Sequence, residues 1–458
     1  MNTSTSFLKK IRIYALTLAL ISGIMTVFTL PTYAVAPFDV TVSDFTQLQT
    51  AIETSYASTT DDMVITVSAP INIAAILTVP SPATRGKTLT IKSASPSNPF
   101  TLTRGATGNL FTIANGAILI LEDIIIDGDK NGSFATGGGS LIRIVGECTL
   151  KSGAVLQNNV YTGAFAYGGG IHSGVGGKFT LSGGKISGNS AEAKGGGVYT
   201  SLGTFTLNNG EISGNICVNG EGGGVHTYDS EFILNGGEIS GNTCVTGQGG
   251  GVYSISPSVL NPCTMNSGKI SGNFATTGGG VYMTETPFTL NGGEISGNSA
   301  TIDGGGVYIR LSIFTMNNGK ISGNSAINDG GGVYLYSEMY TMSGGEISGN
   351  SATNNGGGVC IPASSYAAGF NLGGTAKIIG NTIGTGATVP ANNVYLASGR
   401  YIMLGTGANG MSVSVQTATE SGIFINANAT VADAEYFFAD DNNSKVIHEG
   451  GQLKIVAK

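Results

Sequence analysis

The chain contains 458 residues, including 74 glycines and no tryptophan, and carries a formal net charge of −7. Charged residues make up only 11% of the sequence, well under the roughly 25% of an average soluble protein. The glycines follow no three-residue period, which excludes a collagen, and the absence of a basic cluster argues against a nucleic-acid partner. The surface must therefore be built mainly from Thr, Ser, Asn and Gly.

Residues 1–36 have the pattern of a signal peptide. Lys9, Lys10 and Arg12 precede an apolar run at 13–30, and the small residues at 34–36 resemble a cleavage site. The alternative is a retained membrane anchor, because the run is near spanning length. We expect cleavage, with a secreted or cell-surface product, and the long run is typical of a Gram-positive exporter.

Residues 37–130 are expected to form an N-terminal cap and irregular first coils. Phe45, Leu48 and Ile52 share one face of a short helix that Ser43 can cap. Such a helix would cover the open end of a stacked β structure, which otherwise exposes apolar side chains and unpaired strand edges. Short apolar strands without a repeated phrase follow at 64–67, 77–79 and 89–91.

Residues 131–385 contain one phrase written eight times. The clearest copy reads Gly-Gly-Gly-Val-Tyr at 304–308, Phe-Thr-Met at 314–316 and Gly-Lys-Ile-Ser-Gly-Asn at 319–324. The first apolar residue after the glycine triplet recurs every 26 to 29 residues, at Ile171, Val198, Val225, Val252, Val281, Val307, Val333 and Val359. A fixed period in this range indicates a solenoid or array.

Each repeat holds three short apolar alternations bounded by Gly or Asn, and no segment between them is long enough for a helix. One repeat therefore makes one coil, with equivalent strands of successive coils parallel and ~4.8 Å apart. The predicted fold is an all-β, single-stranded parallel β-helix.

Stacked coils place equivalent side chains in columns. We expect the apolar residues to point inward and the asparagines to bond along the axis through their amides, at Asn189, Asn215, Asn242, Asn273, Asn298, Asn324, Asn350 and Asn381. Six of the seven neighbouring pairs in a second column are opposite in charge: Lys185, Glu211, Glu238, Lys269, Glu294, Lys320, Glu346 and Lys377. We interpret this second column as register control, not as a binding site.

The glycine-triplet phrase and the Ser-Gly-Asn phrase resemble the right-handed parallel β-helix repeats of pectin-lyase-like proteins. More narrowly, they are similar to bacterial adhesin-type repeats and to polymorphic outer-membrane protein repeats. The resemblance covers roughly residues 111–381 and implies a right-handed β-helix. Unlike the outer-membrane family, this sequence shows no translocation barrel after the repeats.

The residue after each Val forms an aromatic column that is the candidate binding face. It holds Tyr199, Tyr253, Tyr282, Tyr308 and Tyr334, with His172, His226 and Cys360 at the equivalent positions. If Val points inward, this column points outward and could stack on sugar rings or another apolar partner. The alternative is that stacked tyrosines simply cover the wall.

Two further pairs invite a chemical interpretation. Asp303 and Asp329 precede glycine triplets in adjacent coils, so they are a weak candidate for a calcium site, against the simpler reading of two solvated loop carboxylates. Cys217 and Cys244 share one repeat position, so they are either a disulfide or two buried thiols. We expect no metal and no cofactor.

Residues 386–458 are expected to form the last coils and a C-terminal β cap. Strands at 445–447 and 453–456 suggest a closing hairpin with its turn at 449–452, and the polar residues 440–443 suggest a plug beside it.

We expect a monomeric, non-enzymatic, adhesin-like protein whose Tyr, Thr and Asn wall binds carbohydrate or another surface protein, with no membrane span after signal cleavage. Arg310 is the only arginine of the eight-copy stretch, and the outward acids form no unique cluster of the kind that polysaccharide-cleaving enzymes need. The alternatives are a polysaccharide lyase or hydrolase of the pectin-lyase-like class and a structural spacer of a surface layer.

Overall fold

The computed structural model describes residues 38–133, 138–258, 261–336, 339–365, 369–385, 389–405, 407 and 410–458. Phe38–Lys458 form one compact unit, and the predicted signal peptide lies outside the described residues. Within the described part, no helix is long and apolar enough to cross a membrane.

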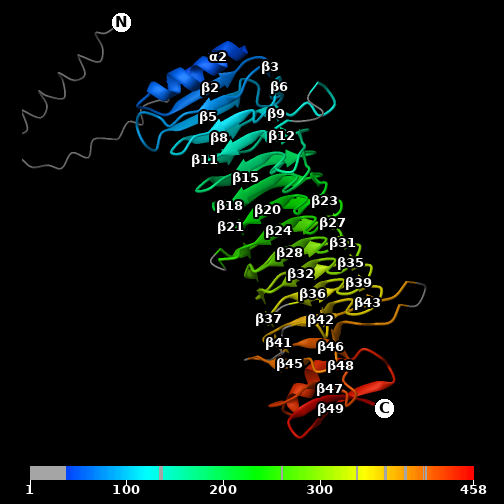
Figure 1. Cartoon of the computed structure of the whole chain (residues 1–458). Helices are drawn as coiled ribbons and strands as arrows, with labels where there is room; N and C mark the ends of the chain where they lie inside the picture. Colours follow the sequence, from blue (N-terminus) through cyan, green and yellow to red (C-terminus); the bar gives the residue numbers. More distant parts are fainter. Residues whose placement is uncertain are drawn as a thin grey trace, which may run out of the picture. The chain divides into compact units, whose positions relative to one another are not determined.

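The described chain is a parallel β-solenoid of about 14 turns, which confirms the predicted fold class. Figure 1 shows the strands of successive coils stacked along one axis, with α2 over one end and β47 and β49 at the other. Four stacks of strands run along this axis.

The first stack carries the Gly-Gly-Gly-Val-Tyr phrase. Its strands are β4 (Leu77–Val79), β7 (Phe111–Ile113), β10 (Ile142–Ile144), β14 (Ile171–Ser173), β17 (Val198–Ser201), β20 (Val225–Tyr228), β24 (Val252–Ile255), β28 (Val281–Thr284), β32 (Val307–Arg310), β36 (Val333–Tyr336), β40 (Val359–Ile361) and β44 (Val394–Leu396).

The second stack carries the Phe-Thr-Leu phrase. Its strands are β1 (Phe38–Val42), β2 (Met63–Val67), β5 (Thr88–Ser93), β8 (Ile118–Glu122), β11 (Glu147–Leu150), β15 (Lys178–Ser187), β18 (Thr204–Ser213), β21 (Glu231–Leu234), β25 (Cys263–Met265), β29 (Phe288–Leu290), β33 (Ile313–Met316), β37 (Met339–Met342), β41 (Gly369–Leu372) and β45 (Tyr401–Leu404).

The third stack carries the Lys/Glu-Ile-Ser phrase, and β15 and β18 run through into it. Its other strands are β3 (Ile71–Ile73), β6 (Thr101–Arg104), β9 (Ile125–Asp127), β12 (Val155–Gln157), β22 (Glu238–Ser240), β26 (Lys269–Ser271), β30 (Glu294–Ser296), β34 (Lys320–Ser322), β38 (Glu346–Ser348), β42 (Lys377–Ile379), β46 (Ser412–Thr417) and β48 (Phe437–Ala439).

The fourth stack is a 9-stranded sheet of two-residue strands directly after each Asn, and the sequence analysis missed it. Its strands are β13 (Val160–Tyr161), β16 (Ser190–Ala191), β19 (Ile216–Cys217), β23 (Thr243–Cys244), β27 (Phe274–Ala275), β31 (Ser299–Ala300), β35 (Ser325–Ala326), β39 (Ser351–Ala352) and β43 (Thr382–Ile383). Two residues are too short to show an alternating pattern, so only pairing between coils identifies these strands.

The interior is one continuous column for each apolar position. Ile295 pairs with Ile321 and Ile321 with Ile347, and all three are fully buried, as the repeat predicted. The corner before the third stack needs glycine, because φ there is positive: +88° at Gly268, +85° at Gly293, +93° at Gly319 and +84° at Gly345.

The N-terminal cap is a helix, as predicted, although its first residue differs. Helix α2 (Phe45–Thr50) continues as a π-helical segment, η1 (Ala51–Tyr56), and buries Leu48 and Ile52 on the first coils. The capping residue is Asp44, whose carboxylate accepts from the Gln47 N–H at 2.9 Å, and not Ser43. Ser43 instead donates its backbone N–H to Gln47 Oε1, because the helix begins one residue later than expected.

The C-terminal cap contains the predicted hairpin. Strands β49 (Ser444–Glu449) and β50 (Gln452–Ala457) pair antiparallel, with Glu449 opposite Gln452 and positive φ at the two turn glycines between them. Strand β47 (Ile423–Ile425) adds to β50 on its other side, and a short 3-10 helix, η2 (Ala432–Tyr436), precedes β48.

Candidate functional site

The predicted aromatic column lies on the outer face of the first stack, but it is not an exposed stripe. Tyr253, Tyr282 and Tyr334 are only 8%, 4% and 9% exposed, and Tyr308 is half-buried. The rings of Tyr282 and Tyr308 lie 4.9 Å apart with planes 4° from parallel, and those of Tyr308 and Tyr334 lie 4.9 Å apart at 14°. The ring faces therefore cover one another, and only ring edges are left for solvent.

This geometry limits how the column could contact a sugar ring. Stacking on a sugar needs a free aromatic face, and the column from Tyr199 through His226 to Tyr334 has its faces occupied by its own neighbours. Burial also raises the pKa of Tyr282 to about 12. The tyrosines of the column are therefore largely buried, and Tyr308 is the most exposed of Tyr253, Tyr282, Tyr308 and Tyr334.

A polar column runs beside the tyrosines, formed by the residue before each glycine triplet. Asp303 Oδ1 accepts the Asp329 N–H at 3.1 Å, and Asp329 Oδ1 accepts the Asn355 N–H at 2.9 Å. Burial raises the pKa of Asp303 to about 6 and also raises that of Asp329. The two carboxylates therefore stack as predicted, but they are half-buried and bonded to the backbone of the next coil.

No third ligand joins these two carboxylates. Among the described residues, no three or more His, Cys, Asp or Glu side chains are placed to hold a metal ion. Calcium takes six to eight oxygen ligands, so a site at this pair would need further oxygens from the backbone, amide side chains or water.

His226 interrupts the tyrosine column and is completely buried between Tyr199 and Tyr253. Neither ring nitrogen has a hydrogen-bond partner in the described part of the chain. Nε2 lies 3.8 Å from Glu221 Oε2, and Glu221 is itself 3.4 Å from the Lys194 ammonium. Burial and the Lys194 charge hold the pKa of His226 well below its usual value.

Cys217 and Cys244 are neighbours in the fourth stack, as their shared repeat position predicted, and they are free thiols. Each thiol donates to a backbone oxygen, Cys217 to Ala193 at 3.4 Å and Cys244 to Gly220 at 2.9 Å. Together with Ala275 they form a small apolar cluster apart from the main core. Of the two predicted alternatives, the structure has the buried thiols.

The predicted asparagine ladder lies inside the corner between the third and fourth stacks, fully buried except for Asn273, which is 1% exposed. In the coil of Asn298, the amide Nδ2 donates to Asn324 Oδ1 at 2.9 Å, as does the backbone N–H at 2.9 Å. The same Nδ2 also donates to Ile270 O in the preceding coil at 2.9 Å. We call this the buried asparagine column.

Charged residues that sequence reasoning missed lie at both ends of the buried asparagine column. At its start, the Asn159 N–H donates to Asn189 Oδ1 at 3.1 Å, and Arg104 Nε donates to Asn159 Oδ1 at 3.2 Å. The buried Arg104 guanidinium also donates to the backbone oxygens of Gly108 and Gly139. At its end, Asn381 Nδ2 donates to Asn393 Oδ1 at 2.9 Å, and Asp440 accepts from the backbone N–H and Nδ2 of Asn393 at 2.9 and 2.7 Å. Residue 440 was predicted only as part of a polar plug.

A second, exposed asparagine column was also missed. It stands at the corner between the second and third stacks and consists of Asn208, Asn235, Asn266, Asn291 and Asn317. Each Nδ2 donates to the Oδ1 of the preceding member, at 2.9, 2.8, 2.9 and 2.8 Å along the column. The signal that could have found it is an Asn one residue after the inward Leu or Met of the Phe-Thr-Leu strand in five successive repeats.

The alternating charge column lies on the third stack, with ion pairs between Lys185 and Glu211 at 3.0 Å and between Lys320 and Glu346 at 3.4 Å. These side chains are 37–49% exposed. Pairs this exposed contribute little to stability, which fits a role in register.

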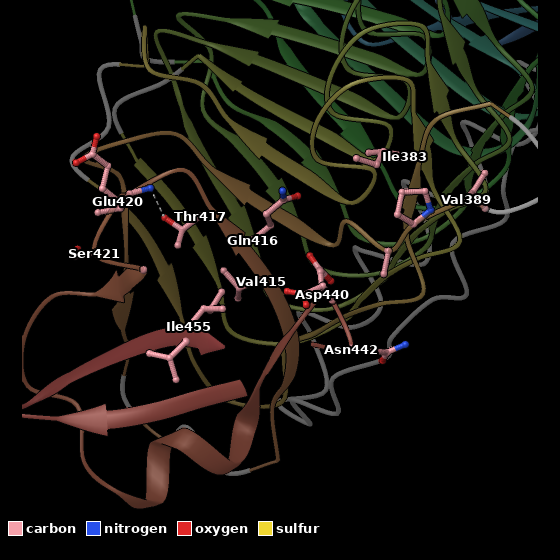
Figure 2. A pocket seen from close by; sticks show the side chains of 16 residues that line it. Ile383, Val389, Val415, Gln416, Thr417, Glu420, Ser421, Asp440, Asn442 and Ile455 are labelled. Carbon is pink, nitrogen blue, oxygen red and sulfur yellow. Dashed lines mark hydrogen bonds between the residues drawn. The ribbon is translucent and has the colours of Figure 1, made fainter. Parts of the chain in front are cut away.

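A cleft of about 990 Å³ lies between the last coil and the C-terminal cap. Its lining comes from β46, from the loop before β47 and from β50 (Figure 2). Two of its carboxylates are engaged, because Asp440 accepts from Asn393 and Asp441 accepts the Asn443 N–H at 2.8 Å, and the third lining carboxylate, Glu420, is exposed. The cleft lies where the C-terminal cap meets the last coils of the solenoid.

The chain matches no protein-family model, no curated protein and no solved structure. The likeness to pectin-lyase-like and adhesin-type repeats consequently remains a likeness of sequence phrases, and the structure supports its coarser part, the parallel β-solenoid.

Proposed function

We propose that this protein is a secreted or cell-surface solenoid that binds carbohydrate through its polar outer wall and performs no catalysis. The observation that carries the proposal is the exposed asparagine column. Each amide there spends one N–H and one oxygen lone pair on its neighbours, so one N–H and one lone pair remain for a ligand. Sugar hydroxyls are both donors and acceptors and can use the two together.

The threonines of the second stack extend this polar wall. Thr264, Thr289, Thr315 and Thr341 pair in register in successive coils and are half-buried, with their side chains on the outer face. Hydroxyls and amides thus repeat once per coil, ~4.8 Å apart, over several coils. Such a wall offers many weak, equivalent contacts, which suits a repetitive ligand.

A glycan array probed with the mature protein tests the proposal. We expect retention on at least one glycan, and loss of most of it in the triple variant Asn235→Ala, Asn266→Ala and Asn291→Ala. Asn318→Ala is the matched control, because Asn318 is an exposed asparagine adjacent to Asn317 that contributes no amide to the column. Thermal unfolding of all variants shows whether the fold is kept.

Two results would contradict the proposal. If the triple variant bound glycan as well as the native chain does, the exposed asparagines would have no role in binding. Release of new reducing ends or unsaturated products from pectin or alginate would favour the alternative of a polysaccharide lyase or hydrolase.

A structural spacer in a surface layer is the second candidate. The observation that favours it is the self-covered tyrosine column, because rings that stack on one another do not offer their faces to a partner. A chain that folds, is exported and retains no glycan on the array would support this role.

A further inference from the structure

A shallow groove of about 520 Å³ follows the solenoid axis beside the exposed asparagine column. Its floor is glycine backbone at Gly183, Gly210, Gly237 and Gly268, and its charged lining consists of Lys185, Glu211, Glu238 and Lys269. Asn209 also lines the groove, and Asn208, Asn235 and Asn266 of the exposed column each stand two residues before a floor glycine in the sequence. We call it the corner groove.

The floor of the corner groove cannot carry side chains. A Cβ on Gly210 would lie 2.4 Å from Gly184 O, one on Gly237 2.6 Å from Gly210 O, and one on Gly268 2.8 Å from Gly237 O. Since φ is also positive at all three, the stacking of coils keeps glycine there. A ligand can therefore approach bare backbone over four successive coils.

The charges of the groove balance. Lys185 pairs with Glu211 at 3.0 Å, and Glu238 accepts from the Ser271 hydroxyl at 2.8 Å. Along the wall the order is Lys185, Glu211, Glu238 and Lys269, so two cations flank two carboxylates and the net charge is zero. A net charge of one sign would attract an oppositely charged polymer, whereas this arrangement gives neither a polyanion nor a polycation an advantage.

We propose that the corner groove binds a neutral, linear polysaccharide parallel to the solenoid axis, with about one sugar unit following each coil. This inference rests on the proposed carbohydrate-binding function and names the ligand class and its orientation. The period supports it, because a coil rise of ~4.8 Å is close to the advance of one sugar in an extended chain. The coils of Asn208, Asn235 and Asn266 then each offer an amide with free hydrogen-bonding capacity to successive units.

The first experiment compares immobilised polymers of different charge. A neutral β-glucan, xylan and mannan are tested beside acidic polygalacturonate and cationic chitosan, at low and physiological salt. We expect retention on at least one neutral polymer, with little effect of salt. Retention only on the acidic or the cationic polymer would overturn this inference and leave carbohydrate binding in place, whereas retention on none would overturn both.

The second experiment measures affinity for a size series of oligosaccharides from the retained polymer. We expect about threefold to tenfold tighter binding for each added unit until the column is filled. Asn266→Ala interrupts the middle of the column and should remove this gain for long oligomers while sparing short ones. Asn318→Ala should leave the whole series unchanged.

An affinity independent of oligomer length would overturn the axial orientation. So would an equal loss for short and long oligomers in Asn266→Ala, because it would indicate one local contact.

Discussion

The two asparagine columns use the same residue and the same amide-to-amide hydrogen bond, but they differ in what the main chain adds. In the buried column, Asn273 N–H and Nδ2 both donate to Asn298 Oδ1. In the exposed column, Asn291 Nδ2 donates to Asn266 Oδ1, and no backbone N–H joins that bond. The buried amides therefore satisfy the backbone of a tight corner, and the exposed amides satisfy only one another.

The backbone N–H donors also fix the direction in which the buried amides point along the axis. A backbone N–H can only donate, so it obliges every buried Oδ1 to face the preceding coil, and the amide dipoles align along the axis. Arg104 then stands at the oxygen end and Asp440 at the N–H end, the signs that complement aligned dipoles. Nothing in the main chain orients the exposed amides, which leaves them free for a ligand.

Removal of one buried amide should give the largest effect. Asn298→Ala leaves the Asn273 N–H and one of the two Asn273 Nδ2 hydrogens without an acceptor and removes the Nδ2 donor to Ile270 O, all in a buried corner. We expect a loss of about 3–5 kcal/mol in the free energy of unfolding, measured by urea titration. A loss no larger than that of an exposed asparagine would refute the distinction between the columns.

Removal of the acceptor at the end of the buried asparagine column should give the next largest loss of stability. Asp440→Ala removes the acceptor for Asn393 N–H and Nδ2, and we expect a loss of about 2–3 kcal/mol at neutral pH. Asp440→Asn keeps an acceptor oxygen and should lose less, which makes it the matched control.

The same position should respond to pH. Burial raises the pKa of Asp440, so the folded chain holds this proton more tightly than the unfolded chain. The proton-linked part of its contribution to stability, which is separate from the acceptor bonds to Asn393, is complete below the ordinary value of about 3.9 and is lost as pH rises through the folded pKa. Asp440→Asn should remove this dependence in urea titrations at several pH values, and an unchanged profile would refute the assignment.

Among the described residues, the tyrosine column contains one buried polar group without a hydrogen bond, the imidazole of His226. Because burial lowers the pKa of His226, its stability contribution is present above about pH 6.5 and is lost as pH falls towards the folded pKa. The slope should reach at most about 1.4 kcal/mol per pH unit.

His226→Tyr installs the residue that most other coils have and should flatten this part of the profile. His172→Tyr is the comparison, because burial and Arg143 lower the pKa of His172 to about 4 and the ring is less deeply buried. If the profile of His226→Tyr matches that of the native chain, the acid sensitivity lies elsewhere.

Removal of one exposed amide should give the smallest effect. Asn291→Ala loses two hydrogen bonds that water can replace, so we expect a change of less than about 0.5 kcal/mol in urea titration. Glycan retention should nevertheless fall. A stability loss comparable to that of Asn298→Ala would show that this column is structural.

The sequence by itself determined the period, and with it the parallel solenoid, the interior column of Ile295, Ile321 and Ile347, the buried asparagine column and the two caps. These follow from local phrases, because a repeated coil can bury its apolar residues only by stacking on its neighbours.

Tertiary structure alone decided what covers each column and what ends it. Burial of Tyr308 depends on rings one coil away, and the partners of Arg104 and Asp440 lie 55 and 47 residues distant in the chain. Neither a ring face occupied by a neighbour nor a charge placed at the end of an amide column leaves a periodic trace, because each depends on contacts between coils.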